Sequence, residues 1–169
     1  MSPTGAAIMG AFGAVWWIVG VAAYGRAAVP LSGVGLVIAA TIIVTAWRLG
    51  RRARPQPPAE ERRQGRLVGI ASAVEGVLIF LAVNVFVNLK RPDLIAPAAA
   101  IIVGLHFLPL ARWLPARLYY ATAALLAAAG IGGLLVPDTR QRIAAISLAA
   151  AAVLWLTCGA VLGSGSETG

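Results

Sequence analysis

The sequence predicts an all-α, polytopic integral membrane protein: a helical bundle of six transmembrane helices in three antiparallel hairpins. Of its 169 residues, 60% are hydrophobic and only 12% are charged, and the mean hydropathy is +0.85. A soluble domain carries about 25% charged residues. The apolar residues also gather into six runs, each long enough to cross a bilayer as a helix. We therefore expect residues 1–169 to form a single transmembrane domain.

The first hairpin is predicted to consist of spans at about 4–25 and 30–48. No Lys or Arg precedes the first span, so it lacks the basic region of a cleaved signal peptide and is expected to be retained. Pro30 suits the start of the second span, because an amide hydrogen there would have no partner within the helix. Trp47 followed by Arg48 marks the interfacial end of that span.

An Arg- and Pro-rich loop at 49–65 follows the first hairpin and is predicted to be cytoplasmic. Together with the residues that flank it, it holds seven of the 14 Lys and Arg residues. Such clusters set topology and meet anionic lipid headgroups far more often than they bind DNA. We therefore expect Arg48–Arg66 to contact the headgroups of the lipid bilayer, and we expect no nucleic-acid partner despite the net charge of +8.

The second hairpin is predicted to consist of spans at about 66–89 and 93–112, joined by a short polar turn. Glu60 and Glu61 are well placed for a helix N-terminus, so the third helix should begin near residue 59, before the membrane. The third hairpin is predicted to consist of spans at about 116–136, after Pro115, and 140–163.

Six spans place both termini on the same side of the membrane. Loops 48–66 and 112–117 hold nine of the Lys and Arg residues, and the opposite loops hold five. Because cytoplasmic loops carry the excess of positive charge, this asymmetry favours a multi-pass protein of the bacterial inner membrane with cytoplasmic termini.

Two titratable residues fall inside the second hairpin. Glu75 is the only acid within an apolar segment, and His106 is the only histidine in the chain. At 1.5 Å per residue, both lie about 20 Å from the polar turn between their spans, hence at the same depth. Three interpretations remain open: a buried pair that docks the two spans, a protonation-coupled site in a cavity, or a contact of Glu75 with lipid headgroups or an oligomer partner.

Further polar residues line the third span on two sides. Ser72 shares the face of Glu75, whereas Asn84 falls about 180° away on a helical wheel, with Asn88 one turn beyond it. We expect the two asparagines to hydrogen-bond to other helices. Protein contacts on both sides would make the third span central.

The fourth span separates a packing face from a polar face. Ala96, Ala100 and Gly104 form a stripe of small residues suited to close helix contact. His106 points about 200° away from Gly104. Pro109 has no amide hydrogen, so the carbonyl four residues earlier stays free next to the histidine. This arrangement is typical of a cavity lining or of a packing kink.

The sequence lacks the signatures of common enzymes and cofactor sites. One histidine cannot build a His-rich metal centre or a bis-histidine haem site. Neither a G-x-S-x-G motif nor a phosphate-binding loop occurs. We therefore expect no enzymatic activity, no cofactor and no metal.

One segment resembles a known group of proteins. Residues 103–111 read VGLHFLPLA and are followed by Tyr119 and Tyr120. This motif is similar to one in an uncharacterised family of small bacterial multi-spanning membrane proteins, and the similarity covers roughly residues 70–125. Members carry an acid in the preceding span, as at Glu75. The resemblance implies no activity.

The function that these observations favour is a small transporter or channel-like protein, with Glu75 and His106 as its polar centre. The alternative is a non-transporting membrane scaffold or accessory subunit, in which the same residues only fix helix packing. The sequence leaves open a homo-oligomer in either case.

Overall fold

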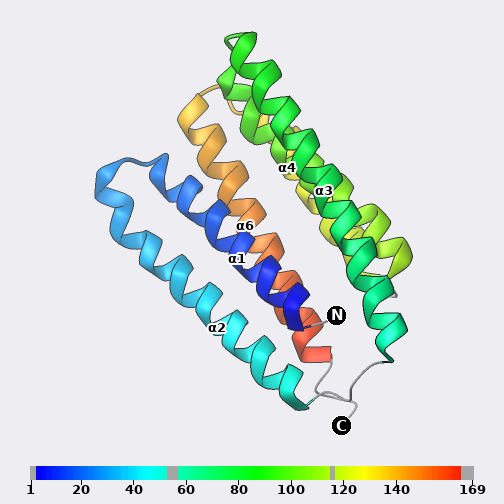
Figure 1. The fold of residues 1–169 in the computed structure, drawn as a ribbon. Coiled ribbons are helices and arrows are strands. Elements are labelled where there is room, and N and C mark those ends of the chain that lie inside the picture. Colours follow the sequence, from blue (N-terminus) through cyan, green and yellow to red (C-terminus); the bar gives the residue numbers. More distant parts are fainter. Residues whose placement is uncertain (1–2, 53–56, 115–116, 165–169) are drawn as a thin grey trace. The chain divides into compact units, whose positions relative to one another are not determined.

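The structure is a computed structural model that describes residues 3–52, 57–114 and 117–164 (Figure 1). These residues form six α-helices and two short 3-10 turns, without a strand, which confirms the all-α prediction. The helices are α1 (Pro3–Ala22), α2 (Ser32–Arg52), α3 (Pro58–Asn88), α4 (Ile95–Trp113), α5 (Leu118–Gly133) and α6 (Thr139–Ser164), and the 3-10 turns are η1 (Arg26–Leu31) and η2 (Pro92–Leu94).

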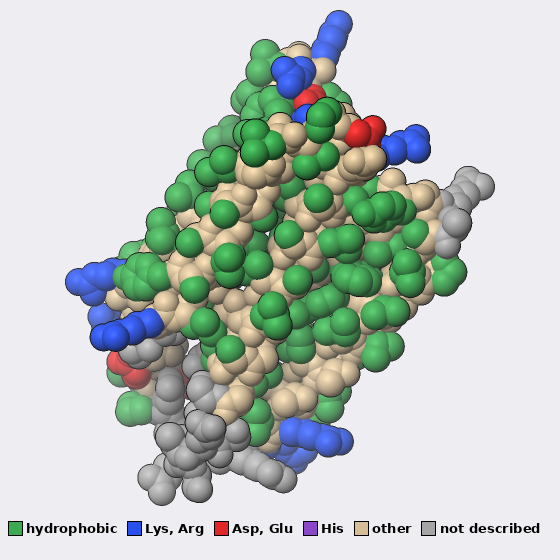
Figure 2. Space-filling model, turned by 180° about the vertical axis from the view of Figure 1, so that it is seen from behind, with side chains coloured by type: hydrophobic (Ala, Val, Ile, Leu, Met, Phe, Trp, Pro, Cys, Tyr) green, Lys and Arg blue, Asp and Glu red, His purple; other side chains and the backbone are tan. Residues whose placement is uncertain are grey.

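Five of the helices are long and apolar enough to cross a membrane: α1, α2, α3, α4 and α6. Apolar side chains cover the middle of these helices, and charged side chains lie toward their ends (Figure 2). The remaining helix, α5, has 16 residues. It is therefore about 24 Å long, shorter than the roughly 30 Å hydrocarbon core. Beyond the end of α5, backbone hydrogen bonds between residues three apart continue the helical turns as far as Val136.

The chain folds into two compact units, one of them discontinuous in sequence. The first unit combines residues 1–53 with 138–169, and the second contains residues 54–137. In the first unit, α1 packs on both α2 and α6, so the first and last helices of the chain are neighbours. Within their own units, α6 packs on α1 and α5 packs on α4, so the predicted hairpin of α5 and α6 joins one helix from each unit.

Two tryptophans fill the contact between α1 and its neighbours in the first unit. The rings of Trp17 and Trp155 lie 5.6 Å apart, and Nε1 of Trp155 donates a hydrogen bond to the carbonyl of Gly10 at 3.2 Å. Nε1 of Trp17 donates to the carbonyl of Leu31 at 2.8 Å. A side chain at Gly13 would overlap the Trp155 indole. The Trp155 indole therefore depends on Gly13 of α1, and the Trp17 indole lies over Gly35 of α2 in the same way.

In the second unit, α4 lies between α3 and α5. The contact of α4 with α5 is close: a Cβ at Gly104 would lie 2.8 Å from the carbonyl oxygen of Ala123, and one at Gly130 would lie 2.7 Å from that of Pro97. The predicted small-residue stripe therefore faces α5, with Ala100 fully buried. The prediction that the third span is central was wrong for this unit, because α3 packs mainly on α4.

The turn between α3 and α4 has a defined geometry. The amide of Arg91 bonds the carbonyl of Phe86 at 2.8 Å, and the amide of Lys90 bonds that of Val87 at 3.0 Å. These two bonds form a Schellman motif, whose turning residue adopts the left-handed conformation. That residue is Lys90, with φ of 56°. The turn reverses the chain so that α4 returns along α3.

Candidate functional site

The antiparallel pair α3 and α4 brings together the two titratable residues singled out from the sequence. Nδ1 of His106 lies 3.4 Å from Oε2 of Glu75, within ion-pair distance. The side chains are only 9% and 12% exposed, respectively. Both residues lie well inside helices that are long enough to cross a membrane. An acid and an imidazole are therefore in contact inside an apolar environment.

The contact leaves hydrogen-bonding capacity unused. Nδ1 of His106 is buried and has no hydrogen-bond partner among the described residues, because its approach to Glu75 lacks the geometry of a hydrogen bond. The imidazole donates a hydrogen bond to the backbone carbonyl of Ala71, one turn before Glu75 on α3. The ring is thus positioned by α3, while one of its nitrogens remains available.

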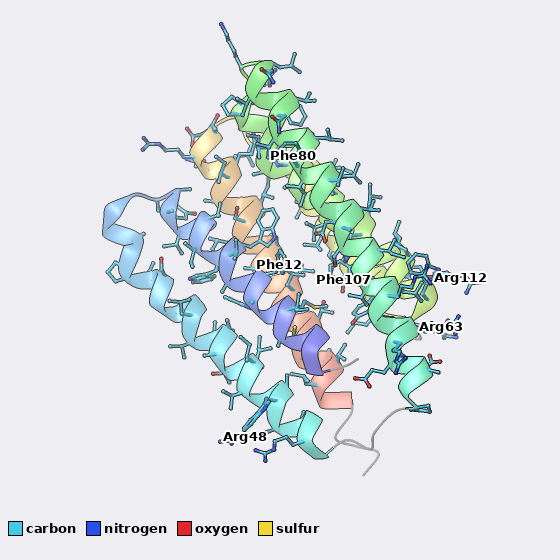
Figure 3. All side chains as sticks on the ribbon, in the orientation of Figure 1. Phe12, Arg48, Arg63, Phe80, Phe107 and Arg112 are labelled. Atoms are coloured by element: carbon cyan, nitrogen blue, oxygen red, sulfur yellow. The ribbon has the colours of Figure 1, made fainter. Side chains whose placement is uncertain are left out.

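Aromatic side chains form the apolar wall beside the imidazole. Phe107 meets His106 edge to face, with ring centroids 5.6 Å apart, and Tyr119 meets Phe107 at 5.5 Å. Phe107, labelled in Figure 3, and Tyr119 are both buried. Sequence reasoning did not assign either ring to the site. The only available signal was that both belong to the motif around His106.

The protonation of this pair determines its charge. With one titratable proton, the pair is neutral overall, either as a carboxylic acid beside an imidazole or as a carboxylate beside an imidazolium. Adding a proton gives a charge of +1, and removing it gives a charge of −1. An unpaired charge in an apolar interior costs several kcal/mol, so the one-proton states are favoured.

The described residues contain no group of three potential metal-ligating side chains.

The remaining polar residues of α3 do not join this site. Ser72, Asn84 and Asn88 are all exposed. Nδ2 of Asn84 donates to the carbonyl of Phe80 and Nδ2 of Asn88 to the backbone carbonyl of Asn84, each at 2.8 Å. The asparagines therefore hydrogen-bond to their own helix, whereas the sequence predicted bonds to other helices.

Pro109 of α4 and a groove on α3 both lie close in sequence to the Glu75–His106 contact. Pro109 lies within α4, which continues as a helix to Trp113. An open apolar groove of about 260 Å³ runs along α3 and is lined by Ala73, Val74, Val77 and Leu78. Glu75 and His106 are not among its lining residues.

Comparison with known proteins gives one match. Residues 2–163 match the family of unknown function DUF7010. The predicted membership of an uncharacterised family is confirmed, but the family's description names neither a sequence motif nor a membrane location. No curated protein and no solved structure matches the chain.

Proposed function

Since the chain belongs to the DUF7010 family, whose function is unknown, we propose a function from its own residues. The protein is a membrane protein, and we propose that it is a small transporter or channel-like protein with a protonatable Glu75–His106 site. The observation that supports this proposal is the contact of 3.4 Å between two largely buried titratable groups on membrane-length helices. An ionisable residue within a membrane span usually marks a pathway for ions or protons.

The chemistry of the pair suits proton exchange. Imidazole and carboxyl groups are among the side chains that most often donate and accept protons in enzymes. Because they are in contact, a proton that reaches one can pass to the other without leaving the site. Nδ1 of His106, which lies 3.4 Å from Oε2 of Glu75, is the atom through which this transfer takes place.

The alternative function, a non-transporting scaffold or accessory subunit, also has an observation in its favour. The side chains of Glu75 and His106 are nearly closed to solvent, and the groove on α3 does not reach them. In a scaffold, the pair only fixes the docking of α3 on α4. The two functions differ in whether protons cross the membrane.

Proton flux into liposomes tests the proposal. The purified protein is reconstituted with a pH-sensitive dye inside, and a potassium diffusion potential drives proton entry. We expect flux with the native protein and a loss of about tenfold or more in Glu75→Gln, equivalent to at least about 1.4 kcal/mol in the barrier. Glu60→Gln, which changes an exposed acid in the first turn of α3, is the matched control and should retain the flux.

A double-mutant cycle separates a missing activity from a missing contact. Glu75→Gln and His106→Gln should each lower thermal stability in detergent, and the double variant should cost less than the sum of the two. Coupling without proton flux in the native protein supports the scaffold. If the loss of stability in the double variant equals the sum of the two single losses, Glu75 and His106 do not interact. That result would contradict the common site that both proposed functions require.

The location and orientation are a further part of this proposal. The excess of Arg in loops 48–66 and 112–117 supports cytoplasmic termini in an inner membrane, with Arg48–Arg66 on anionic headgroups. That orientation requires the short α5 to cross as well. A single cysteine at Gln56, which lies outside the described residues, tests it in a Cys158→Ala background. Labelling by an impermeant reagent in intact cells would contradict a cytoplasmic loop.

A further inference from the structure

One surface row of α3 carries small, aromatic and polar residues at every fourth position. The row consists of Ser72, Gly76, Phe80, Asn84 and Asn88, and we call it the Asn ridge. Residues four apart lie along one ridge of an α-helix. All five are exposed, Phe80 to 66%, and a Cβ at Gly76 would meet no atom within 4 Å. Within the second unit, no other helix packs against this ridge.

The asparagines on the ridge have unused hydrogen-bonding groups. A carboxamide offers two N–H donors and one oxygen acceptor. Each Asn uses one donor, toward the backbone carbonyl four residues earlier. The second N–H and the side-chain oxygen find no partner in the part of the chain that the structure describes. Asn84 lies about 6 Å before the end of α3, between the apolar residues Val83 and Val85. Hydrocarbon offers no hydrogen-bonding partner to these groups.

We propose that the Asn ridge is the contact surface of a symmetric dimer, in which α3 packs against α3 of a second copy of this chain. Two copies inserted in the same orientation are related by an axis along the membrane normal, so each ridge residue faces its own counterpart. A carboxamide is complementary to itself, because each N–H donates to the other oxygen. The residue type at Asn84 therefore fits a second copy.

The shape of the ridge fits the same arrangement. Gly76 leaves open space one turn away from the exposed side chain of Phe80, which is labelled in Figure 3. In a symmetric pair, the ring of each copy packs toward the open space at Gly76 of the other. Small residues at such spacing let membrane helices approach closely, and packing along rows of four gives a crossing angle of about −40 to −50°.

The part of the ridge around Asn84 and the titratable site lie on opposite sides of α3, because the ridge winds round the helix from Ser72, near the face of Glu75, to the far side. Asn84 is about 180° from Glu75 on a helical wheel, and Glu75 faces α4. The dimer therefore leaves the Glu75–His106 contact in place. This inference does not depend on the proposed transport function.

Cysteine cross-linking in native membranes tests the proposal. Asn84→Cys and Val85→Cys are each made in a Cys158→Ala background and oxidised with copper phenanthroline. Val85 is the matched control, because it lies at the same depth and is 50% exposed, but is about 100° around the helix. We expect disulfide-linked dimers at position 84, several-fold more than at position 85. Equal cross-linking at the two positions would overturn the proposal.

A second measurement does not depend on introduced cysteines. The dimer fraction of Asn84→Leu and Val85→Leu is measured by two-colour single-molecule counting in dilute lipid vesicles. We expect a several-fold loss of dimer only for Asn84→Leu, with both variants folded by thermal melting. An unchanged dimer fraction in Asn84→Leu, or a monomeric native protein, would show that another surface or a helix of the same chain covers the ridge.

Discussion

Gly104→Ala is the smallest change that probes how the second unit is packed. The added Cβ would lie 2.8 Å from the carbonyl oxygen of Ala123 and 2.9 Å from the amide nitrogen of Ala127, both backbone atoms of α5. Ordinary van der Waals contact begins near 3.4 Å. The two helices must therefore separate by roughly 0.6 Å, because backbone atoms cannot rotate away as a side-chain end can.

Two opposing effects set the magnitude. Ala is favoured over Gly within a helix by up to about 1 kcal/mol. Overpacking of a close contact costs about 1–3 kcal/mol. Since the clash involves backbone on both sides, we expect a net loss of roughly 1–2 kcal/mol, which is about a 5- to 30-fold shift in the unfolding equilibrium.

The assay is unfolding of the purified protein in detergent, by temperature or by increasing SDS. Gly159→Ala is the control, because it lies within α6 and its Cβ would meet no atom within 4 Å. It should leave stability unchanged or raise it slightly. If Gly104→Ala proves as stable as Gly159→Ala, the close approach of α4 and α5 is refuted.

Three other substitutions probe separate features of the structure by the same thermal assay. Lys90→Gly should raise stability by about 1 kcal/mol, since glycine adopts the left-handed conformation without a Cβ penalty, while Lys90→Ala should not. Ala100→Leu should lose about 1–3 kcal/mol, because the fully buried site has no room for three more carbons, and a neutral result would mean that α5 is loosely packed. Trp155→Phe should lose about 1 kcal/mol with the hydrogen bond to the Gly10 carbonyl, and equal stability would argue against that bond.

The depth of the candidate site could be predicted because it follows from counting. A helix rises by a constant 1.5 Å per residue, so the positions of Glu75 and His106 relative to their common turn put them at one level. The small-residue stripe and the position of the histidine away from it also follow from helical periodicity. The contact at 3.4 Å between the two side chains agrees with both expectations.

The bonding of the asparagines could not be predicted in the same way. A helical wheel places Asn84 and Asn88 on a side of α3 away from Glu75, but it does not show which acceptor is nearest. The carbonyl four residues earlier in the same helix is always within reach of a short polar side chain. In the structure each asparagine bonds to this carbonyl, and no other helix of the second unit lies on that side of α3 to offer a competing acceptor.

The sequence by itself determined the helical class, the apolar helices, the charged linker and the level of the Glu75–His106 site, because these depend on composition and on a regular rise per residue. Only the tertiary structure decided that α6 packs on α1, that α4 is the middle helix of its unit, and that Phe107 and Tyr119 wall the imidazole. In membrane helices, lipid-facing and helix-facing surfaces are both apolar, so hydrophobic periodicity does not reveal the partner. The choice of neighbour depends on whether particular shapes fit, as the Trp155 indole fits over Gly13.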